Sequence, residues 1–161
     1  MTDSDTELPV IRTDRVRFAE TDAQGIVFYG TYFTYMDEAF NALLRAIDYR
    51  YERMHEEGWT THVAHADFDY HAAARFEDVI ESRLGTVRIG EIGFTAAFEV
   101  HREETGAEEA GEAATDKAET GELIASGSVV HVAADRETGE AIRVPADFRE
   151  AVAAYRTEPS E

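Results

Sequence analysis

The segment TDAQG, residues 21–25, places a carboxylate, Asp22, in a short turn before a run of aromatic residues that is typical of a helix start. Gly25 permits a tight turn and a close approach of the backbone. The first N–H groups of a helix lack intrahelical partners and carry a partial positive charge. A carboxylate beside them can attack a carbonyl carbon, or activate water to do so, while the N–H groups stabilise the oxyanion. Asp22 is therefore the first candidate for a catalytic residue.

The same turn also has a purely structural interpretation. An Asp in a T-D-x-x-G turn commonly accepts hydrogen bonds from the backbone just ahead of it, as an Asx-turn or as a helix N-cap. The aromatic residues that follow fit a core or a subunit contact as well as the wall of a pocket; they are Phe28, Tyr29, Tyr32, Phe33 and Tyr35. Taken alone, the turn favours the structural interpretation.

A long helix after the turn is predicted from hydrophobic periodicity. Apolar residues recur at spacings of three and four from Tyr32 to Ile47, which is typical of a helix with a wide apolar face. Thr31 is a suitable N-cap for this helix. Residues 50–58 are expected to add a short helical turn that Gly58 closes.

Strands are predicted on both sides of this helix. The segment from Val10 to Phe18 has strand character before it. After it, Ala64, Phe68 and Tyr70 mark one face of a strand whose other face carries His and Asp residues. The remaining elements are strand-like segments at 78–89, 92–100 and 122–135, and a closing helix that starts at Pro145. Strands that follow one another after a single helix indicate an antiparallel sheet packed on that helix, an α+β fold.

The charge of the chain excludes several classes of partner. The 161 residues include 34 acidic and 15 basic side chains, a net charge of −19, and a single lysine, Lys117. Such a charge disfavours binding to nucleic acid or to anionic membranes. The composition resembles that of proteins from halophiles that keep molar salt in the cytosol. The absence of cysteine favours the cytoplasm, and neither a signal peptide nor a membrane-spanning apolar segment is visible.

The length predicts one domain. Residues 1–9 are expected to be a disordered acidic N-terminus, residues 10–156 a single domain, and residues 157–161 a tail. Residues 102–122 form an acidic insertion without apolar periodicity. We expect this insertion to be an extended surface loop that joins two antiparallel strands.

The segment ETDAQGIVFYGTYFTYMDEA, residues 20–39, resembles the active-site segment of the 4-hydroxybenzoyl-CoA thioesterase family of hotdog-fold acyl-CoA thioesterases. The shared pattern is T-D-x-x-G-apolar-V, followed by Tyr32 and by the acid Asp37. The later segments FDYHAAARFEDVI and ETGEAIRVPADF also resemble this family, so that the resemblance spans about Arg15 to Phe148 outside the acidic insertion. It implies a curved antiparallel sheet wrapped around one long central helix.

The resemblance also implies an activity and site residues. The family hydrolyses acyl-CoA to a carboxylic acid and free CoA, without a cofactor. Its active sites lie between the subunits of homodimers that join their sheets edge to edge and often pair into tetramers. By position, Asp22 matches the catalytic carboxylate, either nucleophile or general base, and a backbone N–H near Tyr29 would polarise the carbonyl. The residues that the resemblance places near the substrate are Gly25, Ile26, Phe28, Gly30, Tyr32, Asp37 and Arg88. Arg88 is included because it is the cation nearest to Gly90 and Glu91, which stand where the family carries a basic pair.

Other functions fit parts of the pattern. A hotdog hydratase or dehydratase would also act on an acyl thioester, but that chemistry usually needs a His with an acid, and the T-D-x-x-G segment contains no His. A non-catalytic dimeric module that binds an acyl thioester would leave Asp22 as a cap only. His65, Asp67, Asp69 and His71 have metal-ligating side chains on one face of a predicted strand. An extended row does not converge on one ion without help, so no metal site is predicted.

Overall fold

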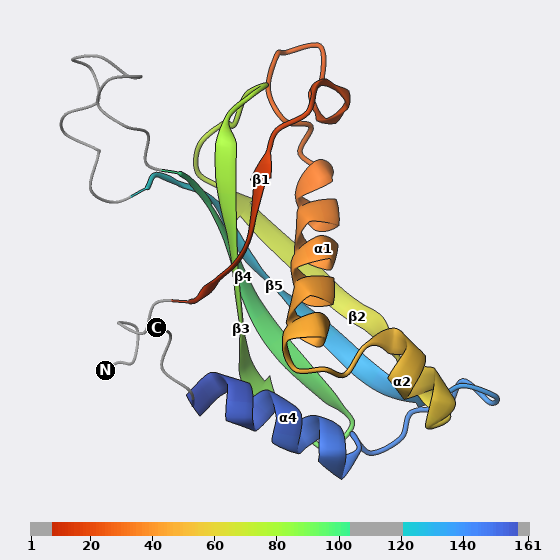
Figure 1. Ribbon diagram of the computed structural model, residues 1–161. Helices are drawn as coiled ribbons and strands as arrows, with labels where there is room; N and C mark the ends of the chain where they lie inside the picture. Colours follow the sequence, from red (N-terminus) through yellow and green to blue (C-terminus); the bar gives the residue numbers. More distant parts are fainter. Residues whose placement is uncertain (1–7, 104–120, 158–161) are drawn as a thin grey trace.

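The computed structural model describes residues 8–103 and 121–157. One five-stranded antiparallel sheet, in the order β1-β3-β4-β5-β2, packs against the long helix α1 (Figure 1). The elements in chain order are β1 (Val10–Arg15), the 3₁₀ helix η2 (Phe18–Glu20), α1 (Thr31–Ala46), α2 (Tyr51–Glu56), β2 (Trp59–Tyr70), β3 (Val79–Ile89), β4 (Gly93–Arg102), β5 (Leu123–Asp135) and α4 (Ala146–Thr157). The predicted α+β class, with an antiparallel sheet on one long helix, is confirmed.

The helix α1 buries the apolar face that its periodicity predicts. Its buried side chains are Tyr32, Tyr35, Met36, Ala39, Phe40, Leu43 and Leu44. The helix starts one residue earlier than predicted, because Gly30 rather than Thr31 is the N-cap and Thr31 is the first helical residue. The reason is a turn just before the helix, in which the Thr31 N–H donates to the carbonyl of Phe28 (2.8 Å).

The strands place alternate side chains against α1. In β4, which overlaps the segment predicted as a strand, Phe94, Ala96, Phe98 and Val100 are buried and the residues between them are partly exposed. In β5, the inward positions include His131, whose ring stacks against those of Phe40 and Phe94 with centroid distances of 4.2 and 5.0 Å.

Two strand predictions need correction. The first strand ends at Arg15, and Phe18 lies in η2 with 75% of its surface exposed. Hydrogen bonds of Arg17 to the Glu20 carboxylate and of the Thr21 hydroxyl to the Phe18 carbonyl fold this segment into a turn. In β2, Ala64 does not share a regular face with Phe68, because the register shifts between Val63 and His65. This bulge makes Ala64 an extra residue of the strand.

The ends of the elements agree closely with the turn signals of the sequence. Gly58, with φ +92°, follows α2 as predicted, and α4 starts directly after Pro145, whose carbonyl accepts the Arg149 N–H (3.1 Å). Most of the acidic insertion lies outside the described residues. At its base β4 and β5 pair as neighbours, and the Arg102 N–H donates to the Glu122 carbonyl (2.8 Å). The predictions of a disordered N-terminus and of a C-terminal tail fall, at residues 1–7 and 158–161, outside the described residues.

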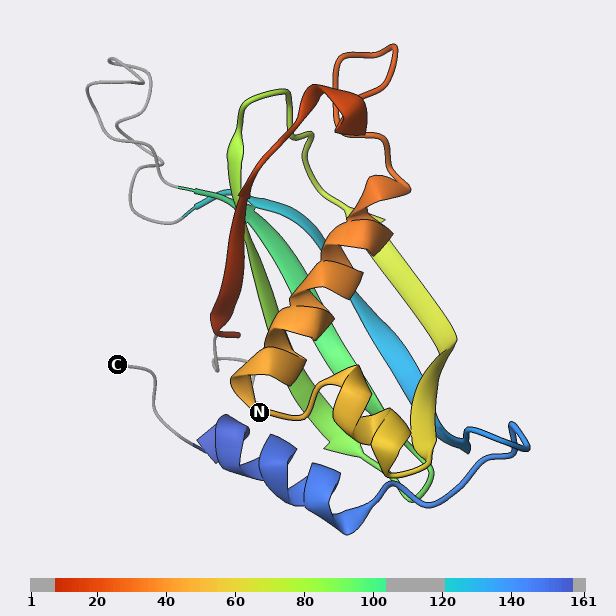
Figure 2. The ribbon, with the colours of Figure 1, turned by 45° about the vertical axis from the view of Figure 1, so that its right-hand side comes forward.

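Two features of this architecture matter for the site. The strand β2 forms a free edge of the sheet, beside α1 and α2 (Figure 2). The loop between η2 and α1 lies at the same end of the molecule as the end of β2, while α2 lies at the start of β2 (Figure 1). None of the described helices is both long enough and apolar enough to cross a lipid bilayer.

Candidate active site

The loop that carries Asp22 is a narrow, hydrogen-bonded turn. Thr21 and Val27 form a β-bridge across it, and the Asp22 N–H donates to the Ile26 carbonyl (2.9 Å). Gly25 has φ +82°, a left-handed conformation that favours glycine. The Val27 N–H donates to the Ala74 carbonyl (2.8 Å), which ties the loop to the turn before β3. The loop is thus a defined platform at the entrance of α1.

The side chain of Asp22 has one occupied and one unoccupied oxygen. Its Oδ1 accepts the Gln24 N–H (2.8 Å), so the Asx-turn that the sequence suggests is present. Within residues 8–103 and 121–157, Oδ2 takes part in no hydrogen bond or ion pair. The side chain is partly exposed at the surface of the loop. The structural role therefore fixes the carboxylate in place and leaves one oxygen available for chemistry.

Two backbone donors, the N–H groups of Tyr29 and Gly30, lie at the foot of the same loop. Neither forms a hydrogen bond within the part of the chain that the structure describes. The N–H groups of Thr31, Tyr32 and Phe33, by contrast, donate to the carbonyls of residues 28–30. The first unpaired donors at the α1 entrance are therefore those of Tyr29 and Gly30, where a developing negative charge would be stabilised.

Both of these peptide groups are held in a fixed orientation. The Phe28 carbonyl accepts the Thr31 N–H (2.8 Å), and the Tyr29 carbonyl accepts the hydroxyl of Tyr70 (3.0 Å). In a planar trans peptide the C=O and the following N–H point in opposite directions. Anchoring the Tyr29 carbonyl on Tyr70 therefore aims the Gly30 N–H away from β2. Tyr70 is a positioning residue for this donor.

Substituting Tyr70→Phe should consequently lower kcat with little change in KM. The loss of one hydrogen bond that orients a peptide corresponds to about tenfold in rate. Steady-state kinetics on an acyl thioester would measure both constants. Tyr155→Phe, which removes a hydroxyl on α4, serves as the control. If both variants keep the wild-type kcat, the proposed positioning role of Tyr70 is wrong.

A second network fixes the other end of the loop. The Glu20 carboxylate accepts hydrogen bonds from the Arg17 N–H (2.9 Å) and from the hydroxyl of Tyr35 (2.8 Å), while its own carbonyl accepts the Phe28 N–H (2.9 Å). Burial alone would raise the pKa of Glu20, but the hydrogen bonds from Arg17 and Tyr35 outweigh it and lower that pKa. Glu20 thus stays ionised and fastens the loop to α1.

Some of the aromatic side chains near the Tyr29 and Gly30 N–H groups are exposed, and others are buried in the core. Phe28 and Tyr29 are exposed at 46% and 66% and are open to a ligand or a second subunit. The Phe28 ring lies over Gly30, where an added Cβ would come within 2.8 Å of it. Tyr32, expected near the substrate, is buried among the core residues at 3% exposure, and burial raises its pKa to about 12.

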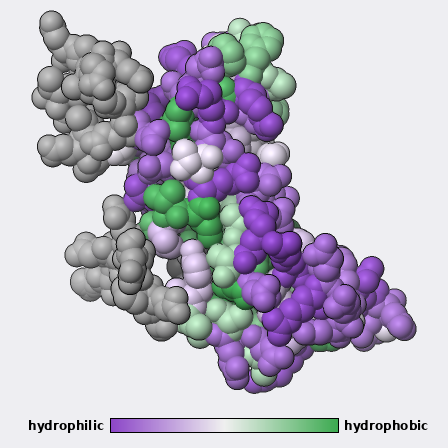
Figure 3. Space-filling view, in the orientation of Figure 1, coloured by the Kyte–Doolittle hydropathy of each residue, from purple (hydrophilic) through white to green (hydrophobic). Residues whose placement is uncertain are grey.

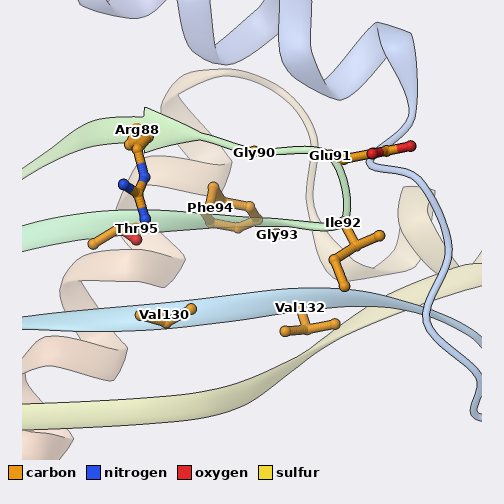
Figure 4. Close-up of a pocket in the computed structure, with 9 residues that line it drawn as sticks. All are labelled: Arg88, Gly90, Glu91, Ile92, Gly93, Phe94, Thr95, Val130 and Val132. Carbon is orange, nitrogen blue, oxygen red and sulfur yellow. The ribbon is translucent and has the colours of Figure 1, made fainter.

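The last two predicted contacts are not brought to this loop within one protomer. Asp37 lies on the exposed side of α1, about 10 Å along the helix from its start, and its pKa is raised by partial desolvation and by Glu38. Arg88 lies near the far end of β3, roughly 30 Å along the strand from the end beside the loop. There it lines a depression of about 360 Å³ with Thr95 and Val130 (Figure 4).

The His and Asp residues of β2 find partners along the sheet. His65 contacts Asp67 (3.0 Å), Asp67 accepts the hydroxyl of Ser128 (3.2 Å), and His71 contacts the Ser126 hydroxyl (2.9 Å). These contacts follow one another along the paired strands β2 and β5, and Asp69 is exposed beside them.

The sequence interpretation missed the positioning residues. It placed Tyr70 on one face of a strand and Tyr35 in an aromatic cluster, without a role for either. The signal of their function is that both are tyrosines, whose aromatic rings pack while their hydroxyls can hydrogen-bond. Which partner they find depends on how β2 and η2 dock on α1.

Comparisons with known proteins identify the family and the fold of the chain. Residues 16–152 match the model of the thioesterase-like superfamily. A putative esterase from Aquifex aeolicus is 34% identical over 97 residues, which cover 60% of this chain and 76% of that protein. The fold and the match define a hotdog-fold thioester hydrolase. The chain belongs to the thioesterase-like superfamily.

Solved structures show the same fold. A hypothetical protein from Aquifex aeolicus superimposes with a TM-score of 0.74 and 26% identity, over 89% of this chain and 99% of its own. A 1,4-dihydroxy-2-naphthoyl-CoA thioesterase from Synechocystis gives a TM-score of 0.75 at 18% identity, over 91% and 97% of the two chains. A gentisyl-coenzyme A thioesterase gives 0.69 at 23% identity, over 88% and 98%.

Proposed function

We propose that this chain hydrolyses acyl-CoA thioesters to a carboxylic acid and free CoA, with Asp22 as nucleophile or general base and the N–H groups of Tyr29 and Gly30 as the carbonyl clamp. The observation that carries this proposal is the geometry of one loop. Among the described residues, Oδ2 of Asp22 and the N–H groups of Tyr29 and Gly30 have no hydrogen-bond partner, and the carbonyls of the two peptide groups that carry these N–H donors are anchored. CoA as the carrier is supported by the names of two proteins of the same fold and by the resemblance to the 4-hydroxybenzoyl-CoA thioesterase family.

The chemistry follows from these groups. Asp22 either removes a proton from water or adds directly to the thioester carbon. In both cases the carbonyl oxygen becomes an oxyanion, which the two N–H groups stabilise before the C–S bond breaks. The CoA thiolate leaves and takes up a proton. If Asp22 is the nucleophile, water then cleaves the acyl anhydride and regenerates the carboxylate. The acyl group would contact Phe28, with Gly25 and Ile26 shaping the loop beside it.

We propose further that the active unit is a homodimer joined through β2. The described residues provide no sheet partner for the outer edge of this 12-residue strand. An unpaired edge of this length is a template for pairing with another chain. Exposed apolar side chains lie along or beside it, with Val63 at 53% and Tyr70 at 44% exposure. Two such edges, paired antiparallel about a two-fold axis, would form one continuous sheet. Light scattering would distinguish a monomer, dimer or tetramer.

The test of the function is hydrolysis of a panel of acyl-CoA esters by the purified protein. Aryl, branched and straight-chain acyl-CoA esters should be compared at low and at molar KCl, with a thiol reagent that reports free CoA. We expect turnover of at least one class. If the protein binds acyl-CoA without releasing thiol from any ester, it is a binding module. If it hydrates an enoyl-CoA instead, it is a hydratase.

We also propose that the protein works in a cytoplasm that contains molar salt. With a net charge of −19, the acidic side chains repel one another in the folded protein and destabilise it. The Debye length falls from about 10 Å at 0.1 M salt to about 3 Å at 1 M, which screens this repulsion. The melting temperature should therefore rise steeply as KCl increases from 0.1 M to multimolar concentrations. Equal melting temperatures at both ends of a KCl series would remove the proposal.

A further inference from the structure

A notch lies between the end of α1 and the start of α2. It is a depression of about 460 Å³, and Arg45, Arg50 and His55 are among its lining residues, with a single carboxylate, that of Glu52. The surface around α2 is strongly hydrophilic (Figure 3). Two guanidinium groups around one hollow give this spot a positive balance, although the chain as a whole is strongly acidic.

The two arginines of the notch differ from the ion-paired arginines of this protein. Many guanidinium groups are paired with an acid; they are Arg12, Arg17, Arg53, Arg83, Arg102 and Arg143. Within the described residues, Arg45 and Arg50 have no acid within salt-bridge distance. Arg45 also complements the partial negative charge at the end of α1, but that role does not apply to Arg50. Unpaired guanidinium groups are well suited to bind phosphate or carboxylate oxygens.

The notch adjoins the start of β2, the strand at the open edge of the sheet, because its lining residue His55 contacts the Thr60 hydroxyl. Phe33, Asp37, Asn41 and Arg45 are spaced by four residues, so they share one face of α1. At one end of this face Phe33 packs on Phe68 of β2, with ring centroids 4.7 Å apart. At the other end Asn41 and Arg45 line the notch. This face of α1 therefore contacts β2 near the active-site loop and carries two residues of the notch at its other end.

The two sites lie at opposite ends of β2. The loop site is linked to the end of β2 by the hydrogen bond from Tyr70 to the Tyr29 carbonyl (3.0 Å). The notch is linked to its start by a contact between His55 Nε2 and the Thr60 hydroxyl (3.2 Å). When two antiparallel strands pair about a two-fold axis, the start of one lies beside the end of the other. The notch of one protomer then lies next to the Asp22 loop of its partner.

We propose that Arg45 and Arg50 bind an anionic group of the acyl-CoA whose thioester lies at Asp22 of the other protomer. This inference rests on the proposed function and deepens it, since each active site would need residues of both subunits. The ligand chemistry is an oxyanion, which has two possible sources. It is either a phosphate of CoA or a carboxylate at the far end of the acyl group.

The arrangement in trans can be tested with mixed dimers. One protomer carries Asp22→Asn and an intact notch, and the other carries Arg45→Ala with Arg50→Ala and an intact Asp22. In such a dimer one site lacks both functions and the other has both. We expect the mixed dimer, isolated with two affinity tags, to recover about half of the wild-type kcat/KM. Activity no higher than that of the parent variants would overturn the proposal.

A binding measurement separates this inference from the proposed hydrolysis. Calorimetric titrations of the Asp22→Asn protein with CoA, pantetheine, succinyl-CoA and butyryl-CoA use ligands that differ in their anions. If the notch binds phosphate, Arg45→Ala with Arg50→Ala should weaken all three CoA compounds about ten- to hundredfold and leave pantetheine unchanged. If it binds an acyl carboxylate, only succinyl-CoA should be weakened. Equal affinities with and without the two arginines would exclude the site, whatever the wild type hydrolyses.

The control variant removes the same charge elsewhere. Arg136→Ala with Arg143→Ala neutralises two exposed guanidinium groups between β5 and α4, outside the notch. It should leave the affinities and the kcat/KM at wild-type values. If it weakens binding as much as the notch variant does, the effect is one of net charge, and the assignment to the notch is wrong. Titrations at several KCl concentrations would show the expected weakening by screening.

Discussion

Replacing Asp22 by Asn is expected to lower kcat by about 10²–10⁴-fold, with a much smaller effect on KM. The substitution keeps an oxygen that can accept the Gln24 N–H, so the Asx-turn survives. It removes the charge from the oxygen that has no partner in the described structure. The loss should therefore fall on the chemical step, measured by the release of free CoA from the best substrate of the panel.

A matched control separates chemistry from turn geometry. Asp135 accepts the N–H groups of Glu137 and Thr138 (2.8 and 2.9 Å) in a turn after β5, and it has no role in the proposed reaction. Asp135→Asn should keep the wild-type kcat and show only a small change in stability. If Asp22→Asn also retains full hydrolysis, Asp22 is a capping residue, and the proposed mechanism is wrong.

The second large effect concerns stability at low pH and arises from His131. The ring is 2% exposed and its Nδ1 has no hydrogen-bond partner in the described structure. Burial lowers its pKa from 6.5 to about 4. As the pH falls below 6.5, His131 becomes protonated in the unfolded chain but stays neutral in the folded protein. The free energy of unfolding therefore falls between about pH 6.5 and pH 4, by about 3 kcal/mol in total.

The variant His131→Leu isolates this contribution, because it places an apolar side chain against Phe40 and Phe94 and removes the titration. Denaturant unfolding should be followed from pH 7.5 to pH 4 for both proteins at the same high KCl concentration. The carboxylates titrate in both proteins, so their contribution cancels in the difference. We expect the wild type to lose more stability than the variant over this range. Parallel curves would show that His131 does not control the acid response.

The parts of the fold that depend on local sequence could be predicted. The periodicity from Tyr32 onwards located α1, and the T-D-x-x-G pattern located the turn that Asp22 begins. Both follow from contacts within a few residues. The errors lie where non-local contacts decide. A bulge in β2 shifts Ala64 out of phase, and the hydrogen bonds of Glu20 turn the chain at Phe18 where a strand was expected.

The candidate site was predictable to the same extent. Asp22, Tyr29 and Gly30 lie on one short loop, so their spacing in the sequence fixes their proximity. The role of Tyr70 depends on the docking of β2 beside the entrance of α1, which no local pattern reveals. Arg88 was expected near the substrate as the cation nearest to Gly90 and Glu91, and β3 carries it to the far end of the sheet within one protomer. The position of Arg88 relative to a substrate therefore depends on how the subunits assemble.

A crystal structure of the Asp22→Asn variant with an intact acyl-CoA would test the central claim most directly. The account predicts that the thioester oxygen lies within hydrogen-bonding distance of the Tyr29 or Gly30 N–H. Its carbonyl carbon should face the side chain at position 22. A thioester bound elsewhere, with these two N–H groups facing solvent, would contradict the account.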